Sequence, residues 1–170
     1  MIVGLGNPIL KYNKTRHNVG IWYLEFLSKL YNKKFKKVKK FNGYVSNINF
    51  LNKKIILFIP DVFMNLNFLS VFKISSFYNI KLYEMLIVHD EMDLKPGFIK
   101  LKTGHGSNGH NGLKGIIQKF CKKKVLYKRL SIGIGRPDHN NISNFVLSQP
   151  TCYEKKKICQ AIKESIFSLF

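Results

Sequence analysis

The chain has 170 residues, 45% of them hydrophobic, which is typical of one globular domain over residues 1–170. No apolar run reaches about 18 residues, so a membrane-spanning helix is not expected, and residues 1–5 lack the basic start and long apolar middle of an export signal. The 29 Lys and Arg against nine Asp and Glu give a net charge of +20, which favours a polyanionic partner. Abundant Asn, Ile, Phe and Tyr also fit an A/T-rich genome, which would raise the lysine count without any function.

Residues 1–5 are predicted to form a buried strand that ends at Gly6, and apolar residues at helical spacing predict a helix over 19–31. Alternating residues over 41–50 and the apolar run 55–59 predict a hairpin around a turn at 52–54. A helix is expected over 62–78, and its predicted inward face comprises Phe63, Leu66, Leu69, Phe72 and Phe77.

Strands are predicted over 85–88, 98–101 and 130–134, with helices over 113–120 and 153–169. Two lysine-rich stretches stand out: residues 33–40, the one candidate for local disorder, and 122–124, followed by Lys128 and Arg129. Each is either a phosphate-facing patch or a solvated loop. The alternation of strands and helices predicts an α/β fold with a mostly parallel sheet.

The three cysteines, Cys121, Cys152 and Cys159, show no metal-ligand spacing and leave an odd thiol in any pairing scheme. We therefore expect free thiols in a reducing, cytoplasmic compartment.

Polar clusters follow Leu5, Ile59, Val88, Leu101 and Ile134 in the chain. Because sites in α/β sheets lie beyond the carboxyl ends of the strands, we expect these segments to converge. The most informative segment is residues 104–112, a loop in which four of nine residues are glycine. Such a loop adopts backbone angles closed to other residues and would bring polar groups close to a substrate.

Several common sites are not favoured. The sequence Gly4-Leu5-Gly6 is not a dinucleotide fingerprint, because Ile9 stands at the third glycine position and no acidic strand end follows. The chain contains neither a phosphate-binding loop nor a nucleophile elbow. A metal site is conceivable, but its candidate ligands lack a paired-histidine spacing, so we expect no metal; these candidates are His89, Asp90, Glu91, Asp93 and His110.

A histidine with a carboxylate and several asparagines suits hydrolysis of an activated acyl bond by water. The histidine would accept a proton, the carboxylate would orient its ring, and an amide would donate to the developing oxyanion. The residues alone leave three rivals for the base, namely His17, His89 and His110.

Several motifs in register resemble those of bacterial-type peptidyl-tRNA hydrolases: residues 2–8, Tyr12, 15–20, 63–66, 89–94, 109–114 and 129–135. The resemblance spans about residues 2–147. It implies a single three-layer α/β domain with a mixed, largely parallel sheet flanked by helices, acting as a monomer without metal or cofactor. It also implies cleavage of the ester between a peptide and the terminal ribose of tRNA. The alternative is a non-catalytic RNA-binding protein on the same scaffold.

The resemblance assigns the general base to His17 and its orientation to Asp90. It assigns substrate contacts to Asn7, Tyr12, Met64, Asn65, His110 and Asn111, with Asn65 or Asn111 as the candidates to assist at the oxyanion. Lys100 and Lys102 would meet the terminal phosphate of tRNA.

This sequence departs from the family pattern at Ile9, Asn67, Phe68, His105, Asn108 and Ser131. The chain stops at Phe170, earlier than most relatives, so its last helix is expected to be trimmed in comparison with theirs. Ser131 stands where the family often has a basic residue that helps to grip tRNA, and Arg129, with Arg136 nearby, would take over this tRNA contact.

Overall fold

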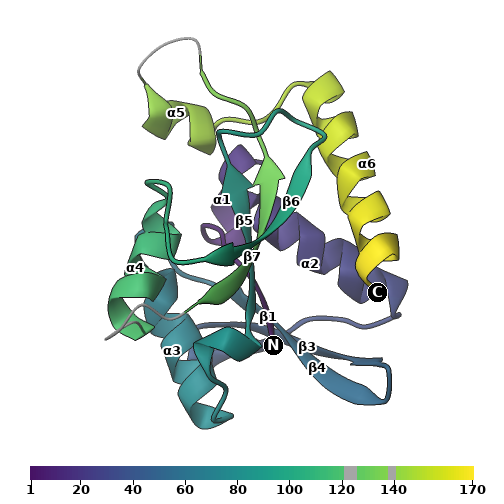
Figure 1. Cartoon of the computed structure of the whole chain (residues 1–170), viewed down its shortest axis with the longest axis vertical. Coiled ribbons are helices and arrows are strands. Elements are labelled where there is room, and N and C mark those ends of the chain that lie inside the picture. The colour runs from purple at the N-terminus through teal and green to yellow at the C-terminus, as the bar shows by residue number, and fades with distance from the viewer. Residues whose placement is uncertain (121–125, 138–140) are drawn as a thin grey trace.

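The structure is a computed structural model that describes residues 1–120, 126–137 and 141–170. In this part of the chain, seven strands form one sheet in the order β2-β3-β4-β1-β5-β7-β6 (Figure 1). The strands are β1 (Ile2–Gly4), β2 (Lys36–Val38), β3 (Gly43–Phe50), β4 (Lys53–Pro60), β5 (Leu86–Glu91), β6 (Ile99–Gly104) and β7 (Tyr127–Gly133).

The four central strands β4, β1, β5 and β7 run parallel to one another, whereas β3 and β6 run antiparallel to their inner neighbours. The outermost strand β2 pairs antiparallel with β3. The carboxyl ends of the central strands therefore meet at one edge of the sheet, as the sequence predicts. Strand β6 differs from that expectation, because it runs back toward the opposite edge.

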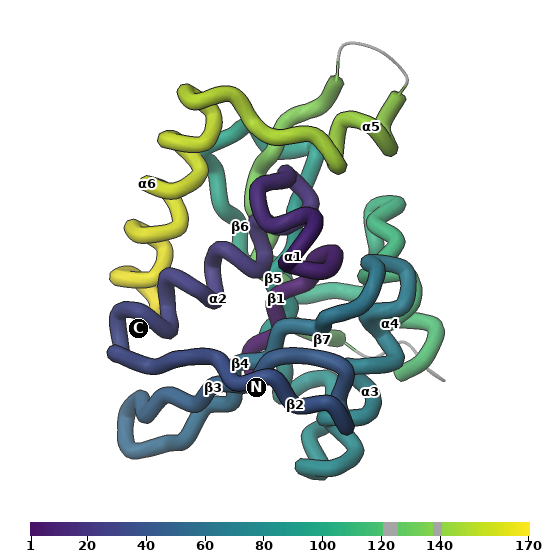
Figure 2. The backbone as a smooth tube through the Cα atoms, turned by 180° about the vertical axis from the view of Figure 1, so that it is seen from behind, coloured from purple at the N-terminus to yellow at the C-terminus, as the bar shows by residue number. Residues whose placement is uncertain are grey.

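Helices cover both faces of the sheet, so the domain has three layers. The helices are α1 (Ile9–Tyr12), α2 (Val19–Leu30), α3 (Asn67–Phe77), α4 (Asn111–Phe120), α5 (Ile142–Leu147) and α6 (Cys152–Leu169). Short 3₁₀ helices lie at η1 (Arg16–Asn18), η2 (Lys39–Phe41), η3 (Met64–Leu66) and η4 (Leu82–Glu84). Seen from behind, α2 and α6 lie on one side of the molecule and α3 and α4 on the other (Figure 2).

Successive residues of the central strands point to opposite faces and enter separate cores. Ile2 and Val88 pack with α2 and α6, while their neighbours Val3 and Ile87 pack with α3 and α4. Strands buried on both faces read as continuous apolar runs, which is why 85–88 is recognisable from sequence. The predicted α/β class and the largely parallel sheet are confirmed.

The predicted inward face of the third helix is wrong. Its five members are between 40% and 59% exposed, whereas Val71 and Ile74 are fully buried. The helix begins at Asn67, after the 3₁₀ turn η3, and it buries Ser70 and Ser75 beside those aliphatic residues. The helix carries two apolar stripes, and period alone could not say which one faces the sheet.

The lysine-rich segment 33–40 contains strand β2, which pairs with β3, and Lys37 forms an ion pair with Asp61 at 2.7 Å. The expectation of local disorder is therefore wrong for 36–38. The other lysine cluster, 122–124, lies outside the described residues. The short elements α1, β2 and α5 were not predicted.

Within the described residues, no helix is long and apolar enough to span a membrane. Cys152 and Cys159 carry free thiols, as expected, and Cys121 falls outside the described ranges.

Candidate active site

A cavity of about 620 Å³ opens beyond the carboxyl ends of β1 and β5. The turn after β1 contributes Asn7, β5 contributes Asp90, and η1 contributes His17. Residues 63–65, which follow β4, form another part of the wall, and His110 and Asn111 enter at the start of α4. The segments that follow Leu5, Ile59 and Val88 therefore converge as predicted. The glycine loop after β6 also reaches the cavity, but only by folding back from the opposite edge.

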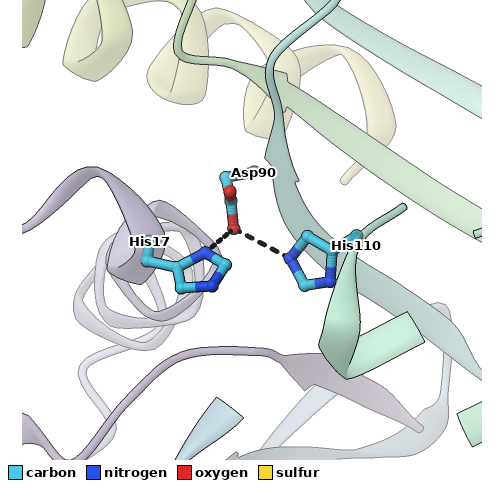
Figure 3. Close-up of side chains that lie close together, drawn as sticks. All are labelled: His17, Asp90 and His110. Carbon is cyan, nitrogen blue, oxygen red and sulfur yellow. Dashed lines mark hydrogen bonds and ion pairs between the residues drawn. The ribbon is translucent and has the colours of Figure 1, made fainter. Parts of the chain in front are cut away.

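Asp90 lies between two imidazole rings (Figure 3). Its Oδ1 atom is 2.8 Å from Nδ1 of His17 and 2.9 Å from Nε2 of His110. All three side chains are largely buried, with 12% of His17, 3% of Asp90 and 7% of His110 exposed. Within the described residues, no hydrogen bond is recorded for Nε2 of His17, the ring nitrogen remote from Asp90.

The hydrogen-bond partners determine which ring nitrogen carries the proton in His110 and in His89. The backbone N–H of Leu113 donates to Nδ1 of His110, so this ring carries its proton on Nε2 and donates it to Asp90. Nδ1 of His89 faces the carbonyl oxygen of Asp90, an acceptor, so it must donate. Nε2 of His89 then accepts from the Ser131 hydroxyl. His17 is thus the histidine whose second nitrogen is left to accept a proton.

The environment tunes the three groups differently. Burial by itself lowers the pKa of His17, but the charge of Asp90 and the hydrogen bond to it outweigh burial and raise this pKa above 6.5. Burial opposes ionisation of Asp90, yet the two imidazoles hold the pKa of its carboxyl well below the usual range. Burial, reinforced by His110, lowers the pKa of His89 to about 3, so this ring is neutral at pH 7.

His17, Asp90 and His110 also form a cluster of possible metal ligands. Their ligand atoms lie within 4.8 Å of one another. A metal on Nε2 of His110 would require the proton on Nδ1, where it would oppose the N–H of Leu113. The hydrogen bond from Leu113 to His110 therefore favours a proton over a metal ion between His110 and Asp90. The sequence candidates Glu91 and Asp93 are not members of this cluster.

Asn7 lines the cavity, and its amide oxygen is already bound. Its Oδ1 accepts from the backbone N–H of Met64 at 2.8 Å, so the NH2 group on Nδ2 lies on the other side of the amide from Met64. The side chain is only 5% exposed and lines the cavity. Asn65 and Asn111 also line it and are more exposed. Asn7, Asn65 and Asn111, the three amides expected at the site, therefore line the same cavity.

Apolar side chains complete the walls. Tyr12 and Phe63 meet edge to face with ring centroids 6.2 Å apart, and Met64 lies beside them. Helix α5 forms the opposite wall through Ile142, Ser143, Val146 and Leu147. The sequence prediction included Tyr12 and Met64 but missed the α5 wall, because α5 itself was not predicted.

The three predicted tRNA contacts lie in different environments. Lys100 and Lys102 project from the same face of the edge strand β6, since side chains two apart share a face. Nζ of Lys102 lies 3.4 Å from the Glu91 carboxylate at the cavity rim. Arg129 is 7% exposed, and its guanidinium donates to the Gly106 carbonyl. Its observed contact supports the glycine loop.

Three departures from the family pattern also make defined contacts. Asn108 takes a left-handed backbone conformation (φ 47°) and donates to Glu91 at 3.0 Å, which ties the glycine loop to β5. Ser131 is buried against His89, and Phe68 packs over Gly115, where an added Cβ would lie 2.7 Å from the ring.

The structure also identifies polar residues to which sequence reasoning gave no role. Arg16 donates to Ser148, to the Gln149 carbonyl and to Glu154, each at 2.7 Å, and so joins η1 to the segment after α5. Asn18 and Asn67 are fully buried and bind backbone groups near the cavity. Their pairing depends on long-range contacts, which no local pattern in the sequence reveals.

A family model described as "Peptidyl-tRNA hydrolase" matches residues 1–169. A relative of that name from Buchnera aphidicola subsp. Cinara cedri is 56% identical over 168 residues, covering 98% of this chain and 87% of the relative. One from Serratia proteamaculans is 44% identical over 166 residues, covering 97% and 84%.

A similar architecture is seen in the crystal structure of peptidyl-tRNA hydrolase from Acinetobacter baumannii. That structure matches with a TM-score of 0.91 and 39% identity, over 98% of this chain and 84% of that one. The agreement in sequence and in fold extends over nearly the whole chain. The chain therefore belongs to the peptidyl-tRNA hydrolase family.

Proposed function

We propose that this chain hydrolyses peptidyl-tRNA by cleaving the ester between the peptide, or an N-blocked aminoacyl group, and the terminal ribose. Such a reaction recycles tRNA from abandoned translation. The observation that carries the proposal is the His17–Asp90 pair, in which one ring nitrogen contacts the carboxylate and the ring lines the cavity. Family membership supplies the substrate class.

The base in this proposal is Nε2 of His17. Asp90 holds the proton on Nδ1 and stabilises the imidazolium that forms when Nε2 takes a proton from water. The hydroxide oxygen bonds to the ester carbonyl carbon, and the carbonyl oxygen becomes an oxyanion. The tetrahedral intermediate then breaks its bond to the ribose oxygen, which receives the proton from His17. A positioned base of this kind contributes roughly 10²–10⁴-fold to the rate.

The oxyanion is placed near Nδ2 of Asn7, because Oδ1 of that amide is already occupied by Met64. One well-placed donor contributes on the order of 10²–10³-fold. Asn65 and Asn111 are assigned to the peptide and ester groups of the substrate, and His110 is assigned to holding Asp90 in place. Tyr12 and Met64 are assigned to the apolar part of the acyl group.

The tRNA contact is assigned to Lys100 and Lys102 on β6, in a chain that carries a net charge of +20. Lysine ammonium groups bind phosphate as point charges and make the affinity depend on salt. Lys102 would exchange its contact with Glu91 for the phosphate. We assign no such role to Arg129, whose guanidinium binds the glycine loop. The proposal includes a cytoplasmic monomer that needs neither metal nor cofactor.

The experiment compares release of the acyl group from an N-acetylated aminoacyl-tRNA with release from the same tRNA carrying a free amino group. Selective cleavage of the blocked substrate is expected. Tight binding of tRNA without cleavage would refute the proposal and would favour the non-catalytic RNA-binding alternative.

A further inference from the structure

Two buried amides hold the turn that carries Asn7. Asn18 accepts from the Asn7 N–H at 2.8 Å and donates to the Asn7 carbonyl at 3.0 Å. Asn67 accepts from the Gly6 N–H at 3.2 Å and donates to the Gly6 carbonyl at 3.0 Å. The backbone N–H and carbonyl groups of both Gly6 and Asn7 are therefore bound by side chains. Asn67 of α3 binds those of Gly6, and Asn18 of η1 binds those of Asn7.

Asn67 also binds the other segment that controls Asn7. Its Nδ2 lies 3.2 Å from the Val62 carbonyl and 3.0 Å from the Phe63 carbonyl, just before the residue whose N–H fixes the Asn7 amide. That N–H, on Met64, lies 2.8 Å from Oδ1 of Asn7. One side chain thus sets the distance between the turn after β1 and the segment after β4.

The turn leaves no room for another arrangement. An added Cβ on Gly6 would lie 2.4 Å from Ile21 and 2.9 Å from Oδ1 of Asn18, so the backbone is pressed against its neighbours. Asn67 is fully buried, so water cannot replace its contacts without opening the core. The orientation of the Asn7 amide therefore depends on Asn67 through the backbone on both sides.

We propose that Asn67 is a positioning residue for the Asn7 amide and, through it, for stabilisation of the oxyanion. This inference rests on the proposed function. Asn67 does not line the cavity and touches no substrate in this account. Its contribution comes from holding Nδ2 of Asn7 within hydrogen-bond distance of the charge that develops during the reaction, where a displacement of about 1 Å costs about 10²-fold.

The test is the substitution Asn67→Asp. It keeps the oxygen that accepts from the Gly6 N–H, but it removes the NH2 group whose two N–H bonds are shared among three backbone carbonyls, those of Gly6, Val62 and Phe63. We expect kcat to fall by about 10–100-fold. KM should stay within about threefold of the native value. The acid limb of the profile of rate against pH should not move, because the substitution leaves the His17–Asp90 contact in place. Asn67→Ser, a smaller polar side chain that can still bind one partner, provides a second variant should the aspartate fail to fold.

The deciding measurement is a double-mutant cycle with Asn7→Ala. If Asn67 acts through Asn7, Asn67→Ser lowers kcat further by less than about threefold in the Asn7→Ala background. Ser70→Ala is the matched control. Ser70 is as buried as Asn67 and lies on the same helix, but it donates to the carbonyl of Asn42, which is 28 residues away in the chain. This control should lower stability while kcat stays within about twofold.

Equal losses of kcat for the Asn67 variant in both backgrounds would overturn the inference, because a purely structural role is additive. A wild-type protein that does not cleave the blocked substrate would instead refute the proposed function. The two failures are therefore distinguishable.

Discussion

Replacement of Asp90 by Asn tests the role of the carboxylate at the centre of the site. The change keeps the shape of the side chain and removes its charge. In the native protein one oxygen, Oδ1, accepts from both His17 and His110. An uncharged amide oxygen at that position accepts hydrogen bonds more weakly. If the amide turned its NH2 group to that position instead, it would face the N–H groups of His17 and His110, donor against donor.

The size of the loss follows from what Asp90 does to His17. The carboxylate is 3% exposed, so its interaction with the ring is little screened by solvent. In the proposed mechanism it holds the tautomer that leaves Nε2 free and stabilises the imidazolium in the transition state. Loss of both effects should lower the plateau of kcat by about 10²–10⁴-fold.

The pH dependence has a defined sign. In the proposed mechanism His17 acts as a base only when it is neutral, so the rate should fall as pH drops through its pKa, which lies above 6.5 in the native protein. Asp90→Asn removes the charge and weakens the hydrogen bond that raise this pKa, and it leaves burial, which lowers the pKa. The variant should be slower, and its acid limb should move to lower pH.

The assay follows kcat/KM for an N-acetylated aminoacyl-tRNA across the acid and neutral range. Asp93→Asn is the matched control, because Asp93 is an exposed carboxylate three residues along the chain and binds Arg136. This control should leave both the plateau and the acid limb unchanged. An acid limb in Asp90→Asn that stays at the native pH, or a plateau within about threefold of the native rate, would refute the reasoning.

Three further results are expected. Lys100→Ala combined with Lys102→Ala should weaken tRNA binding and reduce the slope of log affinity against log salt by about 0.7, the value for one phosphate contact to a single strand; an unchanged slope in a binding titration would dismiss the phosphate role. Ile74→Ala, in the core, should lower the free energy of unfolding by about 2–5 kcal/mol, and Leu69→Ala, at 42% exposure, by under about 1.5 kcal/mol, in urea titrations. Strong chelators should leave the rate unchanged; loss of activity that added metal restores would contradict the metal-free account.

The general plan of the fold is predictable because buried parallel strands have a strong local signal. The apolar runs ending at Leu5, Ile59 and Val88 identify three of the central strands, and their polar continuations identify the rim of the cavity. Short elements such as α1, β2 and α5 contain too few residues for a repeating hydrophobic pattern to stand out. The buried face of α3 was mispredicted because sequence shows an apolar stripe but not the side from which the sheet approaches.

The site shows the same division between local and long-range information. His17, His89 and His110 each stand beside polar residues, so the sequence alone could not choose the base. The choice follows from ring-nitrogen partners, above all the Leu113 N–H on His110. Arg16 and Asn67 bind groups distant in the chain, Arg16 over more than 130 residues and Asn67 over 61. Such pairings become visible only in three dimensions.

The most direct test of the central claim is the turnover of an N-acetylated aminoacyl-tRNA by the native protein and by His17→Ala, with tRNA binding measured on both. The account predicts that the native protein releases the acyl group, and that His17→Ala loses turnover by at least about 10²-fold while binding tRNA with native affinity. Undiminished cleavage by His17→Ala would contradict the assignment of His17 as the base.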